Sequence, residues 1–319
     1  MKNEVIFEKL GIQKITIPLP FRLDHVHCFL VKGATGYTLI DTGLHDEQAK
    51  KIWQEKLLGK DVEKIILTHL HPDHTGYAGV LQKQTNAPVY MSEIDAKAMQ
   101  TIWQEEAIPL LQRDYHTFAV PEQMTEKIIQ LIRKTTNIVE PTPTVQQFLR
   151  DGETINIGDY TYDIIATPGH AEGLVCLYEP ETKVLLSTDH VLPKITPNIA
   201  YWFYGEKNPL LSYKTSLEKI KKLDISYVIP SHGEPFEDVY TRIDEIWAHH
   251  EERIEKTYDA MKNGITVFDM CDILFPYELS VYDYQFAIGE AVAHMEYVRH
   301  EGRCERTIES GVYIYQSLT

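Results

Sequence analysis

Four potential metal ligands fall within six residues in this chain: His69, His71, Asp73 and His74, in the order HxHxDH. They directly follow an apolar run, Lys64–Leu67, that is typical of a buried strand. Side chains two residues apart in an extended segment point the same way, so the first two histidines share one direction. The later pair falls in a turn. An isolated histidine is usually structural, but this cluster favours a fold that aims two ligand pairs at two neighbouring points.

Three later candidates stand where other predicted strands end. They are His170 after Thr161–Ala166, Asp189 after Val184–Leu186, and His232 after Tyr227–Ile229. α/β folds place their sites at the ends of strands. Imidazole and carboxylate together suit Zn²⁺, with Mn²⁺ and Fe²⁺ as the next candidates. Seven ligands exceed the roughly four that one tetrahedral site needs, so we expect two metal ions per chain.

The order of predicted elements indicates an α/β fold class with two additions. The first 45 residues are expected to form strands, and strands then alternate with helices up to about residue 91. Residues 94–140 break that rhythm with two helical stretches, Ala96–Leu111 and Glu122–Arg133, and are expected to be a helical insertion. From Tyr240 onward the pattern is helices followed by a hairpin, the layout of a winged helix. We therefore expect a catalytic domain over 1–239 and a winged-helix-like module over 240–319.

These residues resemble the metallo-β-lactamase fold hydrolase superfamily from about Lys14 to Gly233, including its first motif at Asp41-Thr42-Gly43. The resemblance implies an αββα sandwich of two mixed sheets with helices outside. It also implies roles for the seven ligands. His69, His71 and His170 would bind the first metal, Asp73, His74 and His232 the second, and Asp189 would bridge them. Asp41 would orient a ligand or the loop that carries it.

Comparison with branches of that superfamily narrows the resemblance. Asp189 stands where one antibiotic-degrading branch has a cysteine ligand, and His71 stands where oxygen-reducing di-iron relatives have glutamate. The pattern is closest to glyoxalase II-like, lactonase-like and RNase-like hydrolases. The C-terminal part resembles the tail of the β-lactamase-like endoribonuclease subgroup.

The expected activity is hydrolysis by a hydroxide that bridges two metals, acting on a small ester, thioester or lactone. Asp73 would help to orient the nucleophile, and His190 is a candidate proton donor. The aromatic run Tyr201–Tyr204 would line a substrate pocket with the insertion, or pack in the core or at a dimer contact. Three alternatives remain open: a phosphodiesterase or endoribonuclease, a mononuclear-iron persulfide dioxygenase, and a non-catalytic binding protein.

Charge bears on the partners. The chain has a formal net charge of −16, and residues 240–319 hold seven basic and fifteen acidic residues, a balance of −8. Because phosphate neutralisation supplies most non-specific affinity for nucleic acids, both values argue against such a partner. A small-molecule substrate and a possible homodimer are expected instead. No apolar stretch approaches a membrane span or a signal peptide, and four scattered cysteines suit the cytoplasm.

Overall fold

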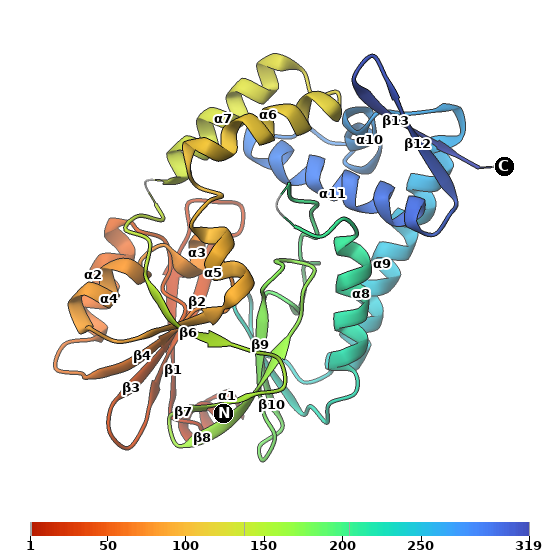
Figure 1. Cartoon of the computed structure of the whole chain (residues 1–319). Helices are drawn as coiled ribbons and strands as arrows, with labels where there is room; N and C mark the ends of the chain where they lie inside the picture. Colours follow the sequence, from red (N-terminus) through yellow and green to blue (C-terminus); the bar gives the residue numbers. More distant parts are fainter. Residues whose placement is uncertain (1, 137, 204, 319) are drawn as a thin grey trace.

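Two mixed β-sheets face each other in the middle of the molecule (Figure 1). The computed structural model describes residues 2–136, 138–203 and 205–318. The first sheet has the order β1-β2-β3-β4-β5-β6, and its strands are β1 Ile12–Pro18, β2 His25–Lys32, β3 Tyr37–Ile40, β4 Val62–Ile66, β5 Val89–Ser92 and β6 Val145–Leu149. The second sheet has the order β11-β10-β9-β8-β7, and its strands are β7 Thr154–Ile157, β8 Tyr160–Ala166, β9 Val175–Glu179, β10 Val184–Thr188 and β11 Tyr227–Pro230.

Helices cover the outer faces of both sheets. The helices up to the second sheet are α1 Lys2–Lys9, α2 Glu47–Lys56, α3 Pro72–Thr75, α4 Ala78–Thr85, α5 Glu93–Met99, α6 Ile108–Thr117 and α7 Glu122–Thr136. Those after it are α8 Pro209–Ile220, α9 Val239–Ala260, α10 Val267–Leu274 and α11 Val281–His300, followed by a hairpin of β12 Cys304–Glu309 and β13 Val312–Ser317. In Figure 1, α2 and α4 lie outside the first sheet, and α8 and α9 lie outside the second.

Three apolar clusters mark the layers. One joins the first sheet to α2, α4 and α5, for example through Trp53 and Leu81. A second lies between the sheets, where Ile66 of β4 and Leu186 of β10 belong to the same cluster. A third joins the outer face of the second sheet to α8, α9 and the C-terminal helices. The layers are therefore helix, sheet, sheet, helix, as the αββα expectation requires.

Strand direction brings the predicted site residues to one edge. β9 runs antiparallel to both β8 and β10, and β11 runs parallel to β10. Strands β8, β10 and β11 consequently end at the same edge of the second sheet, each just before a candidate ligand. In the first sheet β3 and β4 are parallel and end together as well. The central strands β9 and β10 are fully buried, as expected for strands covered on both faces.

Two expectations about local structure were wrong. The first 45 residues do not contain strands alone, because they begin with α1, whose Ile6 and Phe7 pack against the cluster between the sheets. Ala96–Leu111 is not one helix: α5 ends at Met99, a short 3₁₀ turn follows at Glu105–Ala107, and α6 begins at Ile108. Pro109 in the first turn of α6 fits the start of a new helix there, because proline lacks the N–H that a helix interior needs.

The insertion and the C-terminal module meet above the edge where the site residues gather (Figure 1). α7 packs against α11, α6 contacts β13, and α11 also packs on α8 and α9. The order of helices followed by a hairpin agrees with the expectation for this part of the chain. All four cysteines are buried and free. Within the described residues, no helix combines the length and apolarity needed to cross a bilayer.

Candidate metal centre

The seven predicted ligands converge at the shared edge of the sheets. Their ligand atoms form three overlapping groups, each within 4.8 Å: His69, His71 and His170; His69, His74 and Asp189; and Asp73, His74 and His232. The first and third groups are the two ligand sets that the resemblance implied. Fold geometry thus brings together residues as distant in sequence as Asp73 and His232.

Asp189 lies between the two sets. Its Oδ1 is 3.4 Å from His74 Nε2, and its Oδ2 is 3.5 Å from His170 Nε2 and 3.2 Å from His232 Nε2. One carboxylate therefore contacts histidines of both sets, which is the position required of a bridging ligand. The bridging role itself stays a prediction.

Backbone and side-chain acceptors fix the orientation of three imidazoles through Nδ1. The pairs are His74 with Asp41 Oδ2 at 2.8 Å, His170 with the Asn198 carbonyl at 2.8 Å, and His232 with the His25 carbonyl at 2.6 Å. A neutral imidazole that donates from Nδ1 keeps the lone pair of Nε2 for a metal. In each of the three, Nε2 therefore faces the shared space between the ligand sets.

Asp41 also anchors the loop that carries the HxHxDH residues. Its Oδ1 accepts a hydrogen bond from the Thr68 N–H at 2.9 Å, and its Oδ2 accepts one from the Thr68 hydroxyl at 2.8 Å. The backbone of Asp41 has a φ of 58°, in the left-handed region where aspartate and asparagine are over-represented. The structure thus places Asp41 where the resemblance implied, behind both a ligand and the loop.

The chemistry of the donor set fits divalent metals. Five buried ligand atoms have no hydrogen-bond partner among the described residues: Nε2 of His71, His74, His170 and His232, and Oδ1 of Asp189. Buried polar atoms are nearly always paired, so five unpaired ligand atoms in one place indicate a site for a cation. Imidazole nitrogen and carboxylate oxygen are the donors that zinc and its neighbours in the first transition series prefer.

Burial and charge act differently on the histidines. Burial lowers the pKa of His69 and of His71 well below the ordinary value, so both are neutral lone-pair donors. Burial also opposes the charged form of His74, but Asp189, Asp73 and Asp41 outweigh it and raise that pKa well above its ordinary value. Protons and metal ions therefore compete for the second ligand set.

Three supporting residues were missed by the sequence reasoning. Asn198 and His25 act through their carbonyls, which carry no residue-type signal. Asp95 is buried and accepts the N–H groups of Leu70 and Gly173, each at 2.8 Å, so it braces two ligand loops at once. Burial raises the pKa of Asp95 to about 7. The spacing Ser92-x-x-Asp95, a common helix start, was the available signal for it.

Asn198 links the centre to the C-terminal module. Its side-chain Nδ2 donates to Glu290 Oε2 of α11 at 2.9 Å, while its carbonyl accepts from His170. Glu290 in turn pairs with Arg253 of α9 at 3.1 Å. A metal ligand and two helices of the module thus belong to one buried polar network.

The other candidates fall in different surroundings. His190 is fully buried with its ring 5.2 Å from that of Tyr213, and burial lowers its pKa to about 3. This environment favours a neutral packing role, and proton donation by His190 stays a prediction. Of the aromatic run, Trp202 and Phe203 line the main cavity, while Tyr204 lies outside the described residues.

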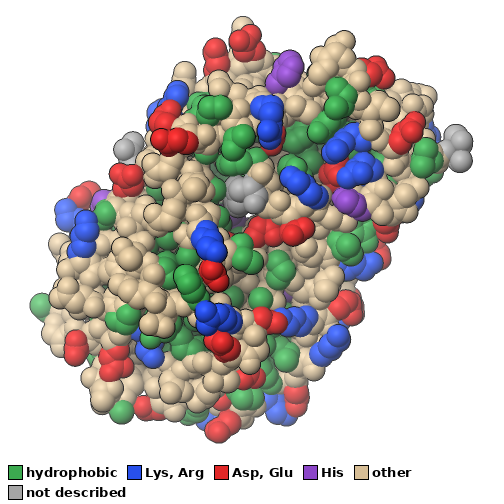
Figure 2. All heavy atoms as spheres, viewed as in Figure 1, with side chains coloured by type: hydrophobic (Ala, Val, Ile, Leu, Met, Phe, Trp, Pro, Cys, Tyr) green, Lys and Arg blue, Asp and Glu red, His purple; other side chains and the backbone are tan. Residues whose placement is uncertain are grey.

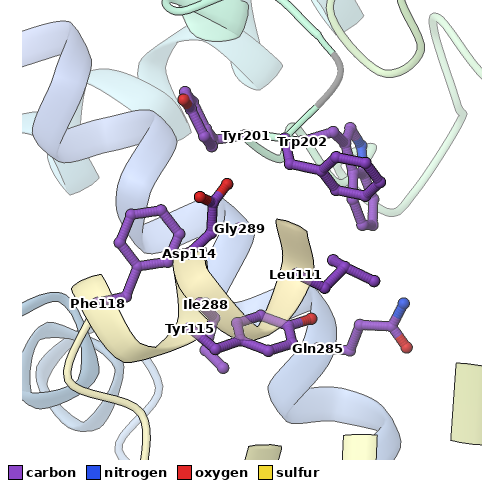
Figure 3. Close-up of a pocket in the computed structure, with 10 residues that line it drawn as sticks. Leu111, Asp114, Tyr115, Phe118, Tyr201, Trp202, Gln285, Ile288 and Gly289 are labelled. Carbon is purple, nitrogen blue, oxygen red and sulfur yellow. The ribbon is translucent and has the colours of Figure 1, made fainter. Parts of the chain in front are cut away.

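A cavity of about 710 Å³ opens directly onto the centre, with His71, Asp73, His170 and Asp189 among its lining residues. Figure 3 shows the seam beside it, where α6, the loop of Tyr201 and Trp202, and α11 meet around a hollow of about 20 Å³. There the N–H of Tyr201 donates to the carbonyl of Gly289 at 2.9 Å. A Cβ on that glycine would lie 2.8 Å from Ala200, so only glycine lets the loop pack so closely on α11.

Comparison with known proteins agrees with this geometry. A Bacillus subtilis (strain 168) protein named "Probable metallo-hydrolase YqjP" is 28% identical over 306 residues, covering 90% of this chain and 92% of the relative. The crystal structure of a metallo-beta-lactamase family protein from Thermus thermophilus is similar with a TM-score of 0.85 and 31% identity, covering 97% of this chain and 99% of the other. A beta-lactamase domain protein from Burkholderia ambifaria matches with a TM-score of 0.87 and 27% identity, covering 97% and 92%.

Family models cover most of the chain. Residues 254–318 match the metallo-beta-lactamase-like C-terminal domain. Residues 22–232, which contain all seven candidate ligands, match the metallo-beta-lactamase superfamily. The chain therefore belongs to the metallo-beta-lactamase superfamily.

Proposed function

We propose that this chain is a binuclear metal-dependent hydrolase that acts on a small ester, thioester or lactone. The observation that carries the proposal is the position of Asp189 between two ligand sets, in the lining of a large cavity. The Bacillus relative, which matches over nearly its whole length, is named a probable metallo-hydrolase, and this name supports the same class of reaction.

The chain's own residues account for binding and orientation. His69, His71 and His170 would hold one metal, Asp73, His74 and His232 the other, and Asp189 both. Divalent metals held there would supply an activated water near neutral pH and a Lewis acid for the substrate oxygen. We propose zinc as the metal, because the donors are nitrogen and carboxylate oxygen.

Asp73 is the ligand best placed to orient a water molecule. Its Oδ2 lies 3.5 Å from His232 Nε2, yet the side chain is still 18% exposed and lines the cavity. A carboxylate that faces the cavity can accept a hydrogen bond from the attacking water and turn its lone pair toward the substrate.

A phosphodiesterase or endoribonuclease has less support. The −8 balance of residues 240–319 opposes phosphate binding, and acidic and basic side chains intermingle over the face in Figure 2. Sulfate esters deserve an assay because one Pseudomonas relative, 25% identical over 65% of this chain and 41% of its own length, is named a linear primary-alkylsulfatase.

For the C-terminal module we propose a winged-helix-like arrangement whose task is to shape the pocket. Its α11 contributes Tyr282, Gln285 and Phe286 to the cavity wall. We also propose that the protein resides in the cytoplasm, where its four buried, free cysteines would stay reduced.

The test is a side-by-side assay of zinc-loaded protein on thioester, lactone, aryl-ester and alkyl-sulfate panels and on single-stranded RNA at physiological salt. We expect metal-dependent turnover of at least one acyl panel, lost in His69→Ala, and little or none on RNA. RNA cleavage that disappears in His69→Ala, with every acyl panel silent, would refute the proposal and favour the endoribonuclease.

A further inference from the structure

The walls of the main cavity come only in part from the sandwich that supplies the ligands. The insertion and the C-terminal module supply much of the rest, through Leu111 of α6, Leu131 and Ile132 of α7, and Tyr282 and Phe286 of α11. Many wall residues thus come from parts of the chain that supply no ligand. The ligands fix the reaction, and the walls determine which molecule fits.

Most of the lining is apolar, although Arg22, Lys134 and Gln285 also belong to it, and two of its other polar residues are engaged with the protein. The amide of Asn198 donates to Glu290, and its carbonyl accepts from His170. The hydroxyl of Thr135 donates to the Leu131 carbonyl at 3.2 Å. Against the apolar part of the lining, hydroxyl or phosphate groups of a substrate would be buried without partners, at a cost in free energy for each.

An aromatic stack holds one wall in place. The rings of Phe21, from the loop between β1 and β2, and Tyr282 of α11 lie parallel with centroids 4.9 Å apart and an interplanar angle of 8°. Both residues line the cavity, so the stack joins the sandwich to the module in its wall. The cavity of about 710 Å³ is therefore a formed part of the fold, in the size range of pockets that enclose most of a ligand.

We infer that the substrate carries one large apolar group, of the kind found in medium and long acyl or alkyl chains, which fills this cavity. The inference rests on the proposed function and names its substrate class. The scissile bond lies at the ligand end, beside Asp73 and Asp189. Water adds across it: the acyl carbon takes the hydroxyl group as a carboxylic acid, the C–O or C–S bond breaks, and the leaving oxygen or sulfur takes the proton.

The wild-type protein with zinc bound tests the inference through two ester series, measured below the concentrations at which the esters aggregate. One series lengthens the acyl group from acetyl to dodecanoyl on a fixed aryl alcohol. The other lengthens the alcohol of an acetate ester. In one of them kcat/KM should rise about threefold to fourfold with each methylene group until the cavity is full. The series that rises identifies the side of the bond that enters the cavity.

Adjacent substitutions on α7 provide a matched pair. Leu131→Trp places a large ring in the cavity, whereas Gln130→Trp places the same ring on the exposed side of the helix. Leu131→Trp should lower the ratio of long-chain to acetyl kcat/KM at least tenfold, and Gln130→Trp should leave that ratio unchanged. Calorimetric titration with decanoate and with acetate gives a second readout without turnover: the wild type should bind decanoate far more tightly, and Leu131→Trp should lose the difference.

The outcomes separate the two proposals. Measurable acetyl-ester hydrolysis with both series flat, or no preference for decanoate over acetate, overturns the apolar substrate class and leaves the hydrolase standing. Silence on every ester, with decanoate bound by the wild type and excluded by Leu131→Trp, overturns the acyl hydrolase and leaves the cavity assignment in place. The two ester series measured on the wild-type protein test the inference even if the variants fail to fold.

Discussion

Replacing Asp41 by asparagine tests how the chain orients a metal ligand. The two carboxylate oxygens accept three hydrogen bonds, from the Thr68 N–H, the Thr68 hydroxyl and His74 Nδ1, at 2.9, 2.8 and 2.8 Å. Asparagine keeps the shape and tolerates the φ of 58°. One of its two polar atoms, however, is an NH₂ group that donates. Whichever way the amide turns, Thr68 N–H or His74 Nδ1 then faces a donor.

The size of the expected loss depends on which way the new amide faces the imidazole of His74. If the NH₂ group faces His74, Nδ1 must accept, and the proton of the neutral ring moves to Nε2, the atom that faces the metal site. Removing a partner behind a ligand typically costs ten- to a hundredfold in metal affinity, which is about 1.4 to 2.8 kcal/mol. If the amide turns the other way, the buried Thr68 N–H loses its acceptor, and the metal-free protein loses about 1 to 3 kcal/mol of stability.

A competition titration of metal-free protein with zinc and a chelating dye, at neutral pH, measures the affinity, and thermal unfolding of the metal-free form measures the stability. Asp238→Asn is the matched control, because Asp238 also accepts a backbone N–H, that of Thr241 at 3.1 Å, but caps α9 away from the ligands. Asp41→Asn should change at least one of the two quantities, and Asp238→Asn should leave zinc affinity unchanged. Wild-type values for both quantities in Asp41→Asn would refute this account of the centre.

Further predictions concern the bridge, the stoichiometry and the response to acid. Asp189→Ala should abolish most turnover of a generic ester while leaving the thermal midpoint of the metal-free form near that of the wild type; near-normal turnover with two metals bound would show that Asp189 is not the bridge. Elemental analysis of zinc-reconstituted protein should give two metals per chain, and a value that stays at one, or a single tightly held iron, would favour the dioxygenase. His294 is buried with a pKa lowered to about 3, so the unfolded chain takes up its proton first and stability should fall as pH is lowered from about 6.5 toward 3, by about 1.4 kcal/mol per pH unit for this group. Denaturant unfolding of the metal-free protein should show a shallower fall in His294→Gln, and an unchanged slope would mean that His294 is already charged in the fold.

Much of this organisation could be predicted because it depends on local patterns. Apolar runs that end in His or Asp marked the strands and the ligands together, and the strands predicted before His170, Asp189 and His232 agree with β8, β10 and β11 to within two residues at each end. The convergence of all seven candidates followed from the rule that parallel strands end at one edge.

The remainder depends on tertiary contacts that leave no local trace. The carbonyls of Asn198 and His25 orient two histidines, but any residue at those positions offers a carbonyl. Helix α1 was missed because its eight residues carry too short a pattern to separate a helix from a strand. The function expected of His190 depended on its neighbour in sequence, whereas its environment is set by Tyr213, 23 residues later.

The network from His170 through Asn198 to Glu290 and Arg253 limits how freely this protein can be recombined. A chimera that exchanged the C-terminal module from the loop before α9 onward would leave the amide of Asn198 facing a foreign helix. Unless that helix offered a carboxylate at the same place, the orientation of a metal ligand would change although no ligand had been touched. The loop at residue 198 and α11 are therefore expected to be inherited, or engineered, as one unit.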